Sequence, residues 1–149
     1  MNCNRIAQSL FVGSCLLDAH ELEELRSLGI TAILILQTAQ DTGDRGTDWE
    51  KRACSIAELP FRSLPVRDFD TADLQRKLPE CVTVLDGMLK AGHTVYLHCT
   101  SGTGRSPTVA VAYLHWCLSW PLVRALGHVR EARDCLPNVE AISGALWPI

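Results

Sequence analysis

The distribution of apolar positions predicts short, deeply buried strands. The run Ile30–Leu36 is rich in leucine and β-branched residues and does not alternate with polar positions, as expected of a strand covered on both faces. Val95–His98 is a second short apolar run. Leu10–Val12, ended by Gly13, and Phe61–Pro65 are weaker strand candidates.

Helical patterns fill most of the chain between these runs. Leu22, Leu25 and Leu28 recur every three residues among charged positions, which is typical of an amphipathic helix that Gly29 stops. Ser106–Leu118 is apolar on almost every side and predicts a buried central helix. The expected helices are Ala19–Leu28, Asp48–Glu58, Asp73–Lys90, Ser106–Leu118, Pro121–Arg133 and Asn138–Leu146.

Single residues refine these boundaries. Asp48 is the expected cap of its helix. Pro79 is expected either to kink the Asp73–Lys90 helix or to begin a second helical piece. Gln37–Thr47 and Val66–Ala72 hold polar and acidic residues and are predicted to be loops.

Alternation of strands and helices predicts an α/β fold around a mainly parallel sheet flanked by helices. The 149 residues suit a single domain, residues 1–149, because the chain has no repeat or linker. In such folds ligands bind beyond the carboxyl ends of the strands. Cys99 directly follows Val95–His98, so we expect this cysteine at the ligand-binding edge.

Charge and hydropathy limit the partners of the chain. A net charge of −3 and a pI of about 5.9 argue against general affinity for nucleic acid or anionic membrane. The longest apolar runs are too short to span a bilayer. We therefore expect neither nucleic acid nor membrane as a partner, and we expect a monomer.

The cysteines argue against metal chemistry. There are seven of them, and no two stand in a CxxC pair, so zinc and thioredoxin-like sites are unsupported. We expect no metal and no cofactor. Without a secretory signal, a reducing intracellular compartment is expected, cytoplasmic by default, or a plastid if a transit peptide has been removed.

The stretch LHCTSGTGRSP, Leu97–Pro107, joins a predicted strand to a predicted helix. A helix N-terminus stabilises an anion, and this applies both to a Cys99 thiolate and to a phosphate. Gly102 and Gly104 permit positive φ and close backbone approach, so successive N–H groups can turn inward around an anion. The expected phosphate-binding residues are Thr100, Ser101, Gly102, Thr103, Gly104 and Arg105.

Three further positions in this stretch suit phosphoryl transfer. Arg105 stands six residues after the cysteine, where its planar fork can contact two phosphate oxygens. Ser106 can hydrogen-bond the sulfur and help it leave. Pro107 falls in the first turn of the helix, where a missing N–H costs little. A buried apolar thiol is the ordinary alternative for Cys99, but the joint spacing of these residues favours catalysis.

The motif Cys-x5-Arg-Ser, Cys99–Ser106, resembles the signature of the cysteine-dependent phosphatases, and of their dual-specificity branch in particular. The chain most resembles the plant glucan (starch) phosphatases, over nearly its whole length, and we expect no carbohydrate-binding module within these residues. The segments that carry this likeness are Leu10–Ser14, Val66–Asp70, Asp73-Leu74, Leu78-Pro79, Val95–Thr100, Ala112-Tyr113 with Trp116, Cys135–Pro137 and Glu140–Ile142.

The resemblance implies a dual-specificity phosphatase fold and a phosphocysteine intermediate. It places the general acid at Asp68, in agreement with the need for one carboxylate that protonates the leaving oxygen and then activates water. Asp70 and Asp73 compete for this role, but helix capping is the favoured interpretation of both. His98 is expected to orient the loop rather than to act as acid or base.

The substrate remains open between phosphotyrosine, phosphoserine or phosphothreonine proteins and phosphorylated glucan. The uncharged side chains of Thr100, Ser101 and Thr103 argue against a polyphosphorylated lipid. Phe69 matches a position where glucan phosphatases stack sugar rings, but it could equally be a hydrophobic plug. Segment 44–47 and Ala72 lack aromatic residues that the glucan enzymes carry there.

Two other functions compete with a phosphatase. A catalytically inactive phosphate-recognition module is disfavoured because nucleophile, arginine and acid are all present. A rhodanese-type sulfurtransferase also uses a cysteine loop, but Asp68 would then have no role.

Overall fold

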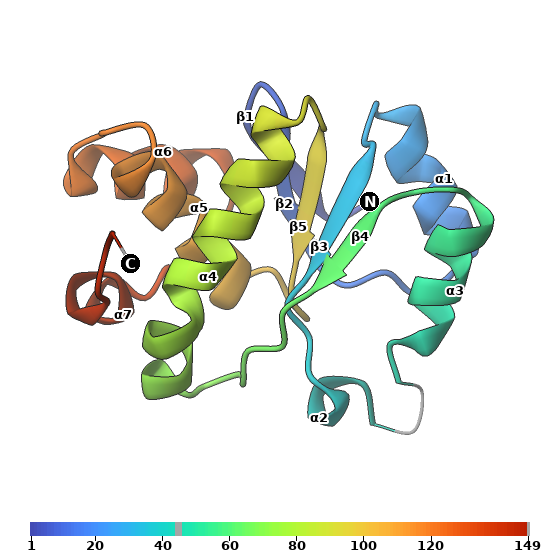
Figure 1. Ribbon diagram of the computed structural model, residues 1–149, viewed down its shortest axis with the longest axis horizontal. Helices are drawn as coiled ribbons and strands as arrows, with labels where there is room; N and C mark the ends of the chain where they lie inside the picture. Colours follow the sequence, from blue (N-terminus) through green and yellow to red (C-terminus); the bar gives the residue numbers. More distant parts are fainter. Residues whose placement is uncertain (44–45, 149) are drawn as a thin grey trace.

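The computed structural model describes residues 1–43 and 46–148, which form a five-stranded sheet with helices on both faces (Figure 1). The strand order is β1-β2-β5-β3-β4, and only β1 runs antiparallel to its neighbour. The mainly parallel α/β architecture is therefore confirmed. The strands are β1 Cys3–Ala7, β2 Leu10–Gly13, β3 Ala32–Ile35, β4 Phe61–Ser63 and β5 Val95–His98.

The helices divide between the two faces of this sheet (Figure 1). They are α1 Ala19–Ser27, α2 Ala39–Thr42, α3 Asp48–Ile56, α4 Thr71–Lys90, α5 Arg105–Trp116, α6 Leu122–Ala132 and α7 Val139–Gly144. Helices α1 and α3 cover one face, and α4, α5, α6 and α7 cover the other. No helix within the described ranges is both long and apolar enough to cross a membrane.

Alternate residues of the central strands enter two separate hydrophobic cores. Leu34 and Leu97 belong to the core beneath α4 and α5, whereas Ile33 and Tyr96 belong to the core beneath α1 and α3. All four side chains are fully buried. This arrangement explains why β3 reads as a continuous apolar run, because neither of its faces meets water.

Strand β1 was not expected from the sequence. It lies at one edge of the sheet and pairs only with β2. Of its five residues only Ile6 is fully buried, so the segment lacks the apolar run that identifies a central strand. The contact with β2, rather than local hydropathy, makes it a strand.

Three boundary predictions need correction. Gln37–Thr47 is not wholly a loop, since it contains α2. Thr47 occupies the N-cap position of α3 without a capping hydrogen bond from its side chain, and Asp48 is the first residue of the helix. Helix α4 begins at Thr71, two residues before the predicted start, because the side chain of Asp70 caps it.

Pro79 does not begin a second helical piece, since one helix spans Thr71–Lys90. A proline inside a helix costs about 3 kcal/mol because it removes one backbone hydrogen bond. On both sides of it α4 buries apolar residues, Leu74, Leu78, Val82 and Leu85, in the core shared with α5. Burial of these side chains outweighs the cost of the proline.

The carboxyl ends of β3, β4 and β5 meet at one end of the molecule, at the bottom of Figure 1. The loop after β5 leads there into the N-terminus of α5, and α2 and the start of α4 lie at the same end. Cys99 is therefore placed at the predicted ligand-binding edge.

Candidate active site

The loop of residues 99–104 connects the end of β5 to the start of α5. The thiol of Cys99 is buried, with its Sγ 3.2 Å from Oγ of Ser106 in the first turn of the helix. The backbone N–H of Cys15, after β2, donates to the carbonyl of Thr100 at 2.9 Å and ties the loop to the sheet. The predicted contact between sulfur and hydroxyl is thus present.

The two loop glycines are not equivalent. Gly102 has φ +72°, and a Cβ there would lie 2.6 Å from the backbone of Gly13, so only glycine fits. Gly104 has φ −115°, and nothing lies within 4 Å of its added Cβ. Of the two glycines that permit positive φ, only Gly102 therefore adopts it.

Arg105 is almost completely buried, and its guanidinium has one unused donor. Its Nη1 donates to the carboxylate of Asp41 and to the Val66 carbonyl, both at 2.8 Å. Its Nη2 donates to Asp41 at 3.1 Å and to Oγ1 of Thr100 at 3.2 Å. The Nε has no partner among the described residues, so one buried N–H remains available to a ligand.

Asp41 is a site residue that the sequence reasoning did not find. Its carboxylate accepts from the backbone N–H of Thr38 at 2.7 Å as well as from Arg105. Burial would raise the pKa of Asp41, but the hydrogen bonds from Arg105 and Thr38 hold that pKa below its ordinary value. The sequence signal at this position was the spacing Thr38-x-x-Asp41, which is typical of a capping box at the start of a helix.

The three candidate acids occupy different environments. Asp68 is about one-third exposed and lies 3.4 Å from Nη2 of Arg105. Asp70 accepts from the backbone N–H of Asp73 at 2.9 Å and caps α4. Asp73 accepts from the backbone N–H of Arg67 at 2.8 Å and from Lys77 at 3.1 Å. Asp70 and Asp73 are engaged in the structure of the loop, and of the three candidates Asp68 forms the ion pair with Arg105.

Opposing effects set the pKa of Asp73. Burial would raise it, but the hydrogen bonds from Arg67 and Lys77, together with their neighbour Arg76, lower it. The carboxylate therefore stays ionised and ties the loop before α4 to the first turns of that helix.

His98 is fully buried beneath the loop between two oxygen atoms. Its Nδ1 lies 3.0 Å from the carbonyl oxygen of Cys99, and its Nε2 lies 2.8 Å from Oε2 of Glu50 in α3. These two contacts fix the orientation of the His98 ring beneath the loop. No sequence pattern singled out Glu50, which stands as one charged residue of a predicted helix.

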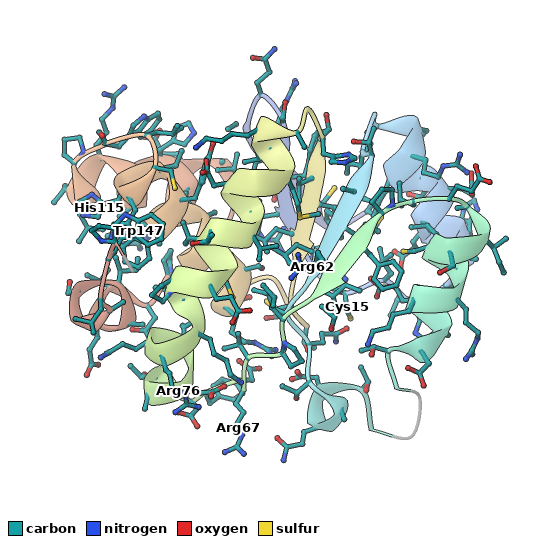
Figure 2. The ribbon with its side chains drawn as sticks, viewed as in Figure 1. Cys15, Arg62, Arg67, Arg76, His115 and Trp147 are labelled. Carbon is teal, nitrogen blue, oxygen red and sulfur yellow. The ribbon has the colours of Figure 1, made fainter. Side chains whose placement is uncertain are left out.

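A cavity of about 490 Å³ opens over Arg105. Its polar lining includes Asp68, Ser101 and Thr103, and its apolar lining includes Phe69 and Leu136. The side chain of Phe69 is completely exposed, and its backbone has φ +58°. Arg67 and Arg76 extend into solvent at this end of the molecule (Figure 2).

The segment 44–47 was expected to lack the aromatic residues of the glucan phosphatases, and its residues 44–45 lie outside the described residues. In the described part of the chain, no cluster of three or more histidine, cysteine, aspartate or glutamate side chains is arranged to hold a metal ion.

A buried thiol beside a helix N-terminus, six residues before a buried arginine, defines the class of cysteine-dependent phosphatases. The sequence model of the family "Dual specificity phosphatase, catalytic domain" matches residues 10–144. The chain belongs to this family, and the predicted resemblance and enzyme class, a phosphoric monoester hydrolase domain, are confirmed.

Two curated relatives are named as phosphoglucan phosphatases. The chain is 36% identical over 151 residues to chloroplastic phosphoglucan phosphatase LSF1 of Arabidopsis thaliana, an alignment that covers all of this chain and 26% of that protein. It is 34% identical to amyloplastic phosphoglucan phosphatase DSP4 of Castanea sativa, over 97% of this chain and 40% of that one. The chain therefore spans well under half the length of each relative.

Solved structures share the fold. The PTP-2 phosphatase of Cydia pomonella matches with a TM-score of 0.79 and 25% identity, over 96% of this chain and 89% of that one.

Proposed function

We propose that this domain hydrolyses phosphate monoesters through a phosphocysteine intermediate, and that phosphorylated glucan is its substrate. The sulfur of Cys99 attacks phosphorus and the bond to the leaving oxygen breaks, while Asp68 donates its proton to that oxygen. Asp68 then takes a proton from water, which attacks phosphorus. The sulfur leaves with a hydrogen bond from Ser106, and inorganic phosphate and the free thiolate result.

The unpartnered Nε of Arg105 is the observation that carries this proposal. A buried N–H without an acceptor costs free energy, on the order of 1–3 kcal/mol. Asp41, Val66 and Thr100 hold Nη1 and Nη2 of the guanidinium, and these contacts fix the orientation of the remaining donor, Nε. A phosphate oxygen bound by the loop after Cys99 would satisfy it.

The position of Asp68 supports its role as the acid. Its carboxylate is close enough to Arg105 to face the same phosphate, yet it is partly exposed and can exchange protons with water. The backbone N–H of Phe69 donates to Oδ1 of Asp68 at 3.1 Å, which leaves Oδ2 directed toward Arg105.

Three observations support a glucan as substrate. The two relatives described above are named as phosphoglucan phosphatases. The fully exposed ring of Phe69 at the mouth of the cavity offers a surface on which a sugar ring can stack. The loop side chains that line the cavity, Ser101 and Thr103, are neutral and suit a single phosphate among hydroxyl groups.

The names of these relatives also place them in a chloroplast and an amyloplast. They support the plastid alternative over the cytoplasm for this protein. We further propose that the domain is monomeric in solution, a point that sedimentation equilibrium decides.

The decisive experiment compares initial rates on phosphorylated amylopectin, a phosphotyrosine peptide, a phosphothreonine peptide and a small aryl phosphate. We expect release from all four, fastest from amylopectin, and none with Cys99→Ser. Full activity of Cys99→Ser would overturn the mechanism. Faster release from either peptide than from amylopectin would overturn the glucan assignment and leave a protein phosphatase.

A matched pair of variants tests the contribution of Phe69. Phe69→Ala is expected to lower the rate on amylopectin about tenfold and to leave the aryl phosphate rate unchanged. It removes a stacking interaction with the sugar ring that contributes roughly 1.5 kcal/mol. Ile56→Ala removes an equally isolated apolar side chain from α3 and is expected to change neither rate. Thiosulfate turnover without phosphatase activity would favour a sulfurtransferase instead.

A further inference from the structure

A second buried arginine contacts the phosphate-binding loop and is not among the residues that line the cavity. Arg133 directly follows α6, and its side chain is almost completely buried. Its Nε donates to the carbonyl of Gly102 at 2.7 Å, and its Nη2 donates to the carbonyl of Ser101 at 2.9 Å. Arg133 thus contacts two consecutive peptide groups of the loop.

The N-terminal segment of the chain holds this guanidinium in place. Nη1 of Arg133 donates to the side-chain oxygens of Asn2 and Asn4, each at 3.0 Å. Asn4 belongs to β1, the strand that pairs only with β2 at the sheet edge. The contacts therefore connect the first residues of the chain to the loop through one side chain.

The two carbonyl contacts determine which way the loop N–H groups point. The Ser101 carbonyl shares a planar peptide group with the N–H of Gly102, and the Gly102 carbonyl shares one with the N–H of Thr103. In a trans peptide the C=O and N–H bonds point in opposite directions. Drawing both carbonyls toward Arg133 turns both N–H groups away from it.

The current partner of one of these N–H groups is weak. The N–H of Thr103 donates to Oγ of Ser101 at 3.3 Å, near the upper limit for a hydrogen bond. An anion in the cavity can replace this long contact with a shorter, charge-assisted one.

The charge of Arg133 is not neutralised by a neighbouring carboxylate. Among the described residues no aspartate or glutamate forms an ion pair with it, whereas Arg105 is paired with Asp41. A buried cation that faces only neutral oxygens is costly unless a negative group lies close by. An anion held on the other side of the loop supplies that charge.

We infer that Arg133 is a positioning residue of the phosphate site: it turns the N–H groups of Gly102 and Thr103 toward the bound phosphate and adds a positive charge behind them. This inference rests on the proposed phosphatase function. It also assigns a role to Asn2 and Asn4, which hold Arg133 against the loop.

Phosphate binding is measured in the Cys99→Ser background, where no turnover intervenes. Titration with inorganic phosphate is compared for this protein and for forms that add Arg133→Met, Asn4→Asp or Arg130→Met. Arg133→Met removes the donors and the charge with similar length, and we expect phosphate affinity to fall about tenfold to a hundredfold. Arg130→Met, an exposed arginine of α6, is expected to leave the affinity unchanged.

Asn4→Asp tests the charge of Arg133 separately from the geometry of its contact with residue 4. It keeps an acceptor oxygen at the same place but pairs Arg133 with a carboxylate, so the positive potential at the loop falls. We expect weaker phosphate binding, by about threefold to tenfold, without loss of the folded loop. Equal affinity of Arg133→Met, Asn4→Asp and the parent would overturn the inference.

Amide hydrogen exchange tests the positioning without any phosphate. In Arg133→Met the N–H groups of Gly102 and Thr103 are expected to exchange faster, and those in the middle of α5 to be unchanged. Unchanged exchange would refute the positioning role. If Arg133→Met does not fold, the double variant Asn2→Ala/Asn4→Ala is tested in the same way. If exchange at Gly102 and Thr103 depends on Arg133 but the protein has no phosphatase activity, only the proposed function is refuted and the positioning role stands.

Discussion

Asp41 and Arg105 form a buried, two-pronged ion pair between α2 and the first residue of α5. The carboxylate oxygens lie 2.8 and 3.1 Å from the two terminal nitrogens of the guanidinium. Because this pair occupies one edge of the planar fork, it orients the other edge, with the free Nε, toward the bound phosphate in the proposed mechanism. Asp41, which is far from Cys99 in sequence, thus orients Arg105 of the Cys-x5-Arg motif.

Asp41→Asn is expected to lower kcat about a hundredfold on an aryl phosphate, because the amide replaces one acceptor with a donor and misplaces the guanidinium. The unfolding free energy is expected to fall by about 3 kcal/mol, since a buried arginine loses its counter-charge. Steady-state kinetics and urea unfolding check both. Asp48→Asn, an exposed carboxylate at the start of α3, is the control and should change neither.

The same pair predicts a pH dependence of stability. The pKa of Asp41 is lower in the folded chain than in the unfolded chain, so its ionised form favours folding. This stabilisation is fully present above about pH 4 and is lost as the pH falls through the folded pKa. The stability difference between the parent protein and Asp41→Asn should therefore shrink below pH 4. A difference that stays constant down to pH 2 would contradict the role of the ionised carboxylate.

The contact between Glu50 and His98 predicts that two substitutions of Glu50 lower the unfolding free energy by different amounts. Glu50→Ala leaves a buried ring nitrogen without an acceptor and is expected to lower the unfolding free energy by about 3 kcal/mol. Glu50→Gln can donate its side-chain N–H to Nε2 while the Nδ1–H of a neutral His98 donates to the Cys99 carbonyl, so it should cost less. Denaturant unfolding distinguishes the two. Equal stability of both variants would show that the contact contributes little.

Asp68→Asn is expected to slow turnover about a hundredfold to ten-thousandfold on substrates with poor leaving groups. The loss should be much smaller on a nitrophenyl phosphate, whose leaving oxygen needs no proton. Asp70→Asn keeps a capping oxygen for α4 and is expected to show no such dependence on the leaving group. A pattern that is the same for both variants would exclude Asp68 as the acid.

The cysteines should react selectively with iodoacetamide. Burial raises the pKa of Cys54 and of Cys81 to about 12, so both remain protonated, unreactive thiols at neutral pH. Cys99 lies beside a helix N-terminus and is expected to be alkylated first, with loss of activity. Peptide mass mapping identifies the site. Inorganic phosphate should protect it, and early labelling of Cys54 or Cys81 would contradict their burial.

Two neighbouring glycines offer a matched pair of substitutions. Gly102→Ala forces a side chain into a left-handed backbone and against Gly13 and Arg133, so phosphatase activity and thermal stability should both fall sharply. Gly104→Ala places its methyl in open space at an ordinary φ and is expected to be tolerated. Thermal melts and aryl phosphate kinetics compare them. Similar losses in both variants would show that the loop tolerates no side chain at either position.

The sequence by itself determined the features that depend on neighbouring residues. Val95–His98 is a buried strand because apolar side chains fill it, and Cys99 must then stand at its carboxyl end. Arg105 and Ser106 must stand at the following helix start, six and seven residues later. These relationships follow from local chain geometry, and the resemblance of Cys99–Ser106 to a known signature predicted the phosphatase family.

Tertiary structure alone decided which residues support that loop. Asp41 is 64 residues from Arg105, Glu50 is 48 from His98, and Arg133 is 31 from Gly102. No local pattern encodes such contacts, because a charged side chain in a loop or helix is normally solvated. Only when the sheet brings these segments to one end does each charge lose water and gain its partner.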